Sequence, residues 1–190
     1  EKKINLLDYP GLSKALICGV LCNGAELIGN GSSYKIFGDP TEGAILTAAA
    51  KAGLWKEAQE KEFVFVDEIP FDSERKKMTI IRRQGQTGYI AFVKGAPDIL
   101  LEDCLEIEEK GVVRRITEED KTGILKTNSA LADSALRVLG VAWRKFDQLP
   151  EKYEAKAIEK DLTFMGLVGM IDPPREEVKK AIEECASAGI

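Results

Sequence analysis

Two short stretches of the sequence combine cations with an aromatic ring, which is the side-chain chemistry that binds a nucleotide. The segment 92–98 (FVKGAPD) predicts a strand that ends on Lys94, a turn at Gly95 and the start of a helix. The segment 71–78 (FDSERKKM) places Phe71 and three cations in a loop between two predicted strands. The ring could stack on a base while the cations meet phosphate. Taken singly, each stretch also fits a solvated basic loop or an ordinary glycine turn.

Three further motifs accompany these two. They are GDPTEGA at 38–44, LRVL at 136–139 and GLVGMIDPPR at 166–175. In their order and spacing, the five motifs resemble the nucleotide-binding domain of a P-type cation-transporting ATPase, and the resemblance covers nearly the whole chain. GDPTEGA and GMIDPPR are most similar to the calcium-type pumps. The heavy-metal class binds nucleotide with a His-Pro motif, and this sequence has no histidine.

The resemblance implies an ATP site and assigns a role to each of its residues. Glu42 would contact the adenine amino group, Phe71 would stack on adenine, Lys94 and Gly95 would lie beside the ring system and the near phosphate, and Lys76 and Arg137 would approach the phosphate chain. Magnesium would accompany ATP in the full-length parent. Animal calcium pumps of this family usually carry an arginine two positions after the phenylalanine, whereas Ser73 stands here. Either ATP binding is weaker, or Arg75 or Lys76 compensates.

The same residues have structural interpretations that the sequence leaves open. Asp39 can cap a helix over 44–52, with Glu42 reaching back to close a capping box. Phe71 could belong to the core, and Arg137 could form a surface ion pair.

The segment 120–123 (DKTG) reproduces the first four residues of the DKTGT sequence on which P-type pumps are phosphorylated. A phosphorylated aspartate of this family ends a buried strand and precedes the nucleotide-binding domain, whereas Asp120 follows polar residues and lies after Lys94. Thr117 and Asp120 have capping-box spacing, so we interpret them as a helix start. We therefore assign no catalytic residue and expect the chain to bind ATP without hydrolysing it.

Composition limits the possible functions. The chain has 190 residues, 44% of them hydrophobic and 31% charged, which is typical of a globular protein. A net charge of −5 argues against a nucleic-acid partner, and no apolar run is long enough to span a bilayer. Cys18 and Cys22 lie four positions apart on one predicted helical face, and we interpret them as core residues and expect no metal site. We expect a monomer.

Periodicity predicts an α+β fold, a twisted and mainly antiparallel sheet of six or seven strands flanked by helices. The predicted strands are 34–37, 63–69, 78–83, 89–94, 104–108, 112–116, 137–144 and 162–171. The predicted helices are 12–23, 44–52, 97–101, 117–135, 150–160 and 175–188, and 27–33 is predicted to be a loop.

The resemblance also implies a domain division and a parent. Residues 1–165 would form the nucleotide-binding domain, and 166–190 would be a hinge strand and first helix returning into the phosphorylation domain. The sequence contains neither the TGD nor the GDGxND motif of that domain. In the parent, on the cytoplasmic side of a membrane, the domain would position the γ-phosphate for an aspartate of the phosphorylation domain and work with the actuator domain. The alternative is an interaction domain that has lost nucleotide binding.

Overall fold

The computed structural model describes residues 6–31, 33–86, 88–151, 153–172 and 176–189. The main body is a seven-stranded sheet with the strand order β3-β4-β5-β8-β9-β6-β7. All neighbouring strands run antiparallel except β6 and β9. The predicted α+β fold with a mainly antiparallel sheet is confirmed. Within the described residues, no helix combines the length and the apolar character needed to cross a membrane.

The sheet aligns side chains from segments that are far apart in the sequence. Its strands are β3 (Phe63–Asp72), β4 (Lys77–Gln84), β5 (Tyr89–Gly95), β6 (Cys104–Glu109), β7 (Val112–Arg115), β8 (Arg137–Phe146) and β9 (Leu162–Met170). In the register of β5 and β8, Phe92 lies opposite Trp143 and Lys94 lies opposite Val141. Alternate positions of these strands therefore form rows that cross one face of the sheet.

Alternation along β5 divides the core into two layers. Ile90 and Phe92 belong to a buried cluster with Leu21 of helix α1 (Pro10–Leu21). Val93, one position along, packs with Leu100 of helix α4 (Pro97–Glu102) on the opposite face. Lys94 has the same parity as Phe92, so the pleat directs it to the face that α1 covers.

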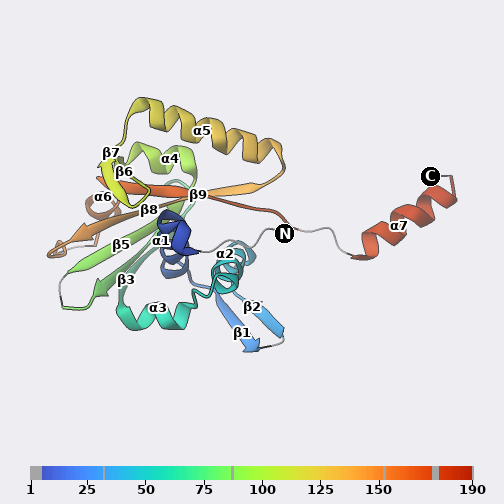
Figure 1. The fold of residues 1–190 in the computed structure, drawn as a ribbon, viewed down its shortest axis with the longest axis horizontal. Coiled ribbons are helices and arrows are strands. Elements are labelled where there is room, and N and C mark those ends of the chain that lie inside the picture. The colour runs from blue at the N-terminus through green and yellow to red at the C-terminus, as the bar shows by residue number, and fades with distance from the viewer. Residues whose placement is uncertain (1–5, 32, 87, 152, 173–175, 190) are drawn as a thin grey trace.

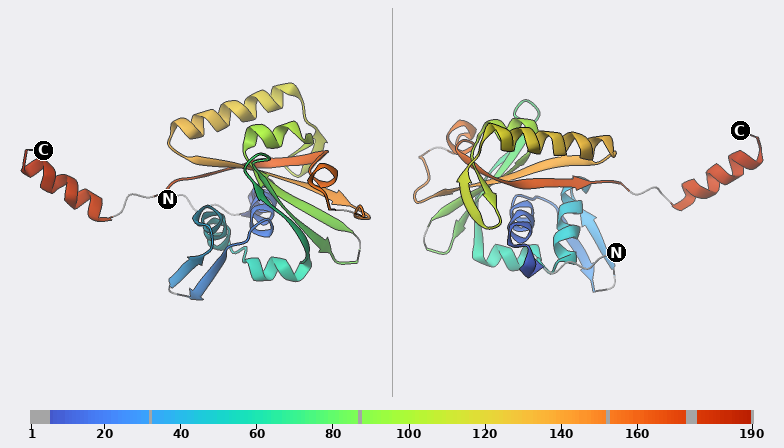
Figure 2. Two further views of the ribbon diagram at one scale, coloured as in Figure 1. Left: turned by 180° about the vertical axis from the view of Figure 1, so that it is seen from behind. Right: turned by 45° about the horizontal axis from the view of Figure 1, so that its top comes forward.

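The helices are α1 (Pro10–Leu21), α2 (Pro40–Lys51), α3 (Lys56–Glu62), α4 (Pro97–Glu102), α5 (Glu118–Asp133), α6 (Ala155–Ile158) and α7 (Glu176–Ser187), with a 3-10 turn η1 (Leu6–Asp8). In Figure 1, α4 and α5 lie on one side of the sheet, and α1, α2 and α3 lie on the other. The two further views in Figure 2 show the same layers, with α7 apart from the sheet. The arrangement is therefore helix, sheet, helix.

The prediction of a loop at 27–33 was wrong. Glu26–Asn30 forms strand β1, which pairs with β2 (Ser33–Phe37) in a separate two-stranded sheet. A side chain at Gly29 would come within 2.1 Å of the carbonyl oxygen of Ser33, so this glycine permits the close approach of the two strands. Most of the hairpin's side chains are exposed, so no alternation of buried and polar residues marks it as strand.

Three other elements differ from the predictions. Helix α3 was not predicted. Of the helix predicted at 150–160, only α6 is helical, and its Ile158 packs on the sheet. Strand β3 continues to Asp72, so Phe71 lies at the end of a strand and not in a loop. The last three residues of the GLVGMIDPPR motif, Pro173, Pro174 and Arg175, lie outside the described residues. No observation tests the predicted division at 165/166, which stays a prediction.

Candidate functional site

A pocket of about 440 Å³ lies where the ends of β3, β5 and β8 meet the start of α2. Such a volume is typical of sites for small organic ligands. Five of the six predicted site residues line it, namely Glu42, Phe71, Lys94, Gly95 and Arg137. Because they come from four separate segments of the chain, only the tertiary fold brings them together.

Phe71 provides an exposed aromatic ring at this pocket. The residue is 64% exposed, so it is not part of the core. It lies one position before Asp72, which pairs with Lys77 at the turn between β3 and β4. An exposed ring at the mouth of a pocket can stack on a flat ligand.

Lys94 and Glu42 form a buried ion pair in the pocket wall. Lys94 is only 7% exposed, and its ammonium group contacts a carboxylate oxygen of Glu42. The ammonium also donates to the backbone oxygen of Cys22 at 2.6 Å. Cys22 is the C-cap of α1, where the helix dipole favours a cation. The pocket therefore contains a fixed positive charge that is largely neutralised by its partner.

Glu42 does not use its carboxylate to close a capping box. Its second carboxylate oxygen accepts a hydrogen bond from the backbone nitrogen of Gly24 at 3.0 Å. Asp39 caps α2, as predicted, but without the predicted capping box: its carboxylate accepts from the backbone nitrogens of Thr41 at 2.7 Å and Glu42 at 3.3 Å. Partial desolvation raises the pKa of Asp39, but the hydrogen bonds from Thr41 and Glu42 outweigh it and leave the pKa below its ordinary value.

Arg137 lies exposed at the rim of the pocket, at the first position of β8. Its guanidinium donates to the hydroxyl oxygen of Thr41 at 3.0 Å. Thr41 is in the first turn of α2, so this bond joins the start of the helix to the first residue of β8. The charge of Arg137 also helps to lower the pKa of Asp39, and the guanidinium has further N–H donors that can meet an anionic ligand.

Gly95 lines the pocket beside Lys94, whereas Lys76 lies outside its lining. A side chain at Gly95 would lie 2.5 Å from the carbonyl oxygen of Lys76, so the glycine is needed for the close approach of β4. That same carbonyl accepts from the backbone nitrogen of Ala96 at 3.0 Å. The side chain of Lys76 is exposed and does not line the pocket.

The structure bears on the compensation suggested for Ser73. The guanidinium of Arg75 contacts both carboxylate oxygens of Glu159, and it donates to the backbone oxygen of Pro70 at 2.6 Å. Glu159 also accepts from the hydroxyl of Thr79 at 2.7 Å. Arg75 therefore joins the turn between β3 and β4 to Glu159. Lys76 is the remaining candidate to compensate for the arginine that Ser73 replaces.

Sequence reasoning missed several pocket residues. The remaining lining residues are Gly24, Gly38, Asp39, Thr41, Glu68, Met78 and Leu139. Met78 could have been found, because it lies directly opposite Lys94 in the register of β4 and β5. Leu139 lies two positions after Arg137 on the same face of β8. Nothing in the sequence distinguishes Glu68 from other strand carboxylates.

Asp120 lies at a helix start, as predicted. Thr117 and Asp120 form a reciprocal capping box at the beginning of α5. Arg114 donates to both carboxylate oxygens of Asp120, at 2.6 and 2.8 Å. These hydrogen bonds from Arg114, followed by those from Thr117, hold the pKa of Asp120 well below its ordinary value. The carboxylate of Asp120 is thus engaged by the helix cap and by the ion pair with Arg114.

The cysteine pair of α1 belongs to the core. Cys18 and Cys22 are buried, and their thiols donate to the backbone oxygens of Ala142 at 3.2 Å and Met78 at 3.4 Å. Burial raises the pKa of Cys22 to about 11, although the charge of Lys94 opposes the shift. Among the described residues, no group of three or more histidine, cysteine, aspartate or glutamate side chains gathers as a metal site.

Comparison with known proteins identifies the family. The family model described as "P-type ATPase, cytoplasmic domain N" matches residues 11–177. The calcium-transporting ATPase of Bacillus subtilis (strain 168) is 42% identical over 193 residues, which cover 100% of this chain and 21% of that protein. The calcium-transporting ATPase 1 of Bacillus cereus is 42% identical over 171 residues, covering 90% of this chain and 18% of that protein.

A relative with lower sequence identity matches most of the chain as well. The probable cation-transporting ATPase F of Mycobacterium tuberculosis (strain H37Rv) is 36% identical over 177 residues, covering 93% of this chain and 19% of that protein. The chain thus spans about a fifth of the length of the curated relatives that it matches. From the extent of the family match and the identity to these relatives, the chain belongs to the family of P-type ATPase cytoplasmic N domains.

Proposed function

We propose that this chain is the ATP-binding domain of a P-type cation-transporting ATPase. Its task is to position the γ-phosphate of ATP for transfer to an aspartate on the neighbouring phosphorylation domain, which is a matter of orientation and not of covalent chemistry. The observation that carries the proposal is the convergence of five residues on one pocket, namely Glu42, Phe71, Lys94, Gly95 and Arg137.

The surroundings of each residue support a separate role. Phe71 is exposed and supplies a face on which adenine stacks. Glu42 is held in place by Gly24 and Lys94, so its carboxylate is oriented to accept from the adenine amino group. The ammonium of Lys94 bonds Glu42 and Cys22, and its third N–H is left to donate to the ligand beside the ring system and the near phosphate.

The two exposed cations bind the phosphate chain. Arg137 stands at the rim and approaches the outer phosphates, exchanging its bond to Thr41 for charge-assisted bonds. Lys76 approaches the phosphates from outside the pocket lining. In the parent, magnesium accompanies ATP, and the phosphorylation and actuator domains are the partners.

The names of the relatives support the identity of the parent. Two of them are named calcium-transporting ATPases, so we assign the parent to the calcium-type pumps and place this domain on the cytoplasmic side of a membrane. Residues 1–165 are the nucleotide-binding domain in this proposal, and 166–190 begin the return into the phosphorylation domain. The chain by itself binds ATP and does not hydrolyse it.

A heteronuclear NMR titration of the chain with ATP, ADP, AMP and GTP tests the proposal. A dissociation constant near millimolar corresponds to only about 4 kcal/mol, and NMR detects binding that weak. The adenine nucleotides should shift the amide signals of Glu42, Phe71 and Lys94, and GTP should shift them less. With ATP and magnesium, no phosphate should be released. An absence of any shift at several millimolar ATP would favour the interaction domain instead.

A further inference from the structure

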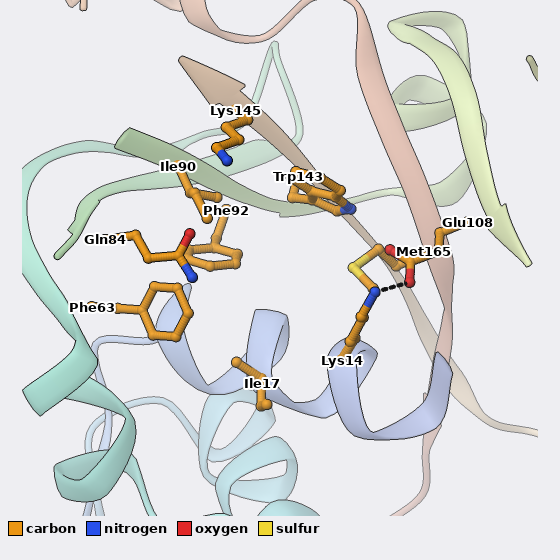
Figure 3. Close-up of a pocket in the computed structure, with 10 residues that line it drawn as sticks. All are labelled: Lys14, Ile17, Phe63, Gln84, Ile90, Phe92, Glu108, Trp143, Lys145 and Met165. Carbon is orange, nitrogen blue, oxygen red and sulfur yellow. Dashed lines mark hydrogen bonds and ion pairs between the residues drawn. The ribbon is translucent and has the colours of Figure 1, made fainter. Parts of the chain in front are cut away.

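A second pocket, of about 250 Å³, lies at the other end of the face that α1 covers. Figure 3 shows its side chains converging from α1 and from the strands β3, β4, β5, β6, β8 and β9. Its lining residues are Lys14, Ile17, Phe63, Gln84, Ile90, Phe92, Glu108, Trp143, Lys145 and Met165. It shares no lining residue with the pocket of Phe71 and Lys94. Most of the wall is aromatic or aliphatic.

One end of this pocket contains two buried polar atoms without partners. The side chain of Glu108 is 1% exposed, and one of its carboxylate oxygens contacts the ammonium of Lys14. Its other oxygen, Oε2, is buried and has no hydrogen-bond partner among the described residues. The indole nitrogen of Trp143 is likewise buried and without a partner there. In Figure 3, the nitrogen-bearing edge of the Trp143 ring is on the side towards Glu108.

Two such atoms at one end of an apolar pocket indicate a complementary ligand. At least nine in ten buried polar groups are hydrogen-bonded in folded proteins, because a group without a partner is costly. Glu108 Oε2 needs a donor and Trp143 Nε1 needs an acceptor. A water molecule could meet both needs, but it occupies only about 30 Å³ and cannot fill the apolar part of the pocket.

Size and charge define the chemistry of the ligand further. An apolar cavity of about 150 Å³ holds benzene, so this larger pocket admits a fused two-ring molecule. Phe63, Phe92 and Trp143 offer aromatic surfaces to flat rings. Glu108 is already paired with Lys14, and Lys145 also lines the pocket, so a neutral ligand is favoured over a cation.

We propose that this pocket is a second ligand site, specific for a neutral, flat, two-ring nitrogen heterocycle with a donor and an acceptor on one edge. The N–H of the ligand donates to Glu108, and its acceptor nitrogen receives the indole N–H of Trp143. The proposal does not depend on ATP binding, because the two pockets have separate residues.

Benzimidazole is the probe for this site, since it joins two fused rings with one N–H and one acceptor nitrogen. The chain contains two tryptophans, so its NMR spectrum has two indole N–H signals. Trp55 packs against Tyr34 with the two rings tilted and their centroids 5.3 Å apart, and it lies outside the pocket. Benzimidazole should shift the Trp143 indole signal and leave that of Trp55 unchanged, with a dissociation constant on the order of 1 mM.

Two matched ligands test the hydrogen bonds without changing the protein. 1-Methylbenzimidazole lacks the donor, and indole lacks the acceptor, so each should bind about fivefold more weakly. Trp143→Phe keeps an aromatic ring but removes the N–H, so its binding is followed through the backbone amide signal of Phe92, which also lines the pocket. This variant should bind benzimidazole about fivefold more weakly and indole with unchanged affinity. Equal binding of all three ligands would overturn the proposal. So would the absence of a shift of the Trp143 indole signal at about 10 mM benzimidazole.

Discussion

Two lysine–glutamate pairs lie at the two ends of α1, and they differ in how completely they are satisfied. At the C-terminal end, Lys94 and Glu42 are both largely shielded, and each also bonds a backbone group, the oxygen of Cys22 and the nitrogen of Gly24. Towards the N-terminal end, the side chain of Lys14 is 52% exposed, and Glu108 keeps one buried oxygen without a partner in the described chain.

The presence of an ion pair therefore does not by itself show how much the pair contributes to the stability of the fold. A buried charge that loses its partner is strongly destabilising, whereas a pair with one solvated member contributes little. The Lys94–Glu42 pair therefore belongs to the framework of its pocket. The Lys14–Glu108 pair leaves unused hydrogen-bonding capacity, which is the property expected of a ligand site.

The largest expected effect follows removal of the buried cation. Lys94→Met leaves Glu42 partly buried without its charge partner and leaves the oxygen of Cys22 without its donor, so we expect a loss of about 3 kcal/mol in the free energy of unfolding. Urea denaturation measures it. The exposed Lys76→Met is the matched control, with an expected change within about 0.5 kcal/mol. Similar stabilities for the two variants would contradict the framework role.

The next effect concerns binding at the same pocket. Phe71→Ala removes the exposed ring and should weaken ATP by about 1–3 kcal/mol, or roughly 5- to 150-fold, without a loss of fold. NMR titration measures the change. Phe65→Ala is the matched control, since Phe65 is an exposed phenylalanine of the same strand that does not line the pocket. Equal losses in both variants would remove the case for stacking on Phe71.

A smaller effect is expected at the cap of α2, and it depends on pH. Asp39→Ala should cost about 1 kcal/mol at neutral pH, because two backbone donors lose their acceptor. The pKa of Asp39 is lower in the folded chain than its ordinary value, so its contribution is present above the unfolded pKa and is lost as the pH falls through the folded one.

Urea denaturation of the native chain and Asp39→Ala between neutral pH and about pH 3 tests this prediction. The difference in stability should shrink only at the acidic end of the series. A difference that persists unchanged into acid would show that the carboxylate charge is not what caps the helix.

The smallest expected effect is at the other pair. Glu108→Met removes the buried oxygen that has no partner and returns Lys14 to solvent, so the free energy of unfolding should change by less than about 1 kcal/mol, in either direction. Glu42→Met is the matched variant at the first pair and should be clearly destabilising, because Lys94 stays buried. If the two variants cost the same, the comparison between the pairs fails.

Features fixed by neighbouring residues could be predicted from the sequence. The Asp39 cap of α2 and the capping box of Thr117 and Asp120 were both predicted, because each joins residues two or three positions apart. The alternation of phenylalanine and valine within 63–69 predicted β3 for the same reason. Hairpin β1–β2 was missed, because its side chains are mostly exposed and its pattern carries no sign of burial.

The sequence by itself determined the class of the fold, the family motifs and the residues able to bind a nucleotide. Only the tertiary structure decided which of them meet. Glu42 pairs with Lys94 across 52 positions, and Arg75 with Glu159 across 84, because strand pairing sets long-range neighbours. The pocket of Glu108 and Trp143 has no motif at all. It exists because β6, β8 and α1 converge there, and the partners of a buried atom depend on the packing of the whole sheet.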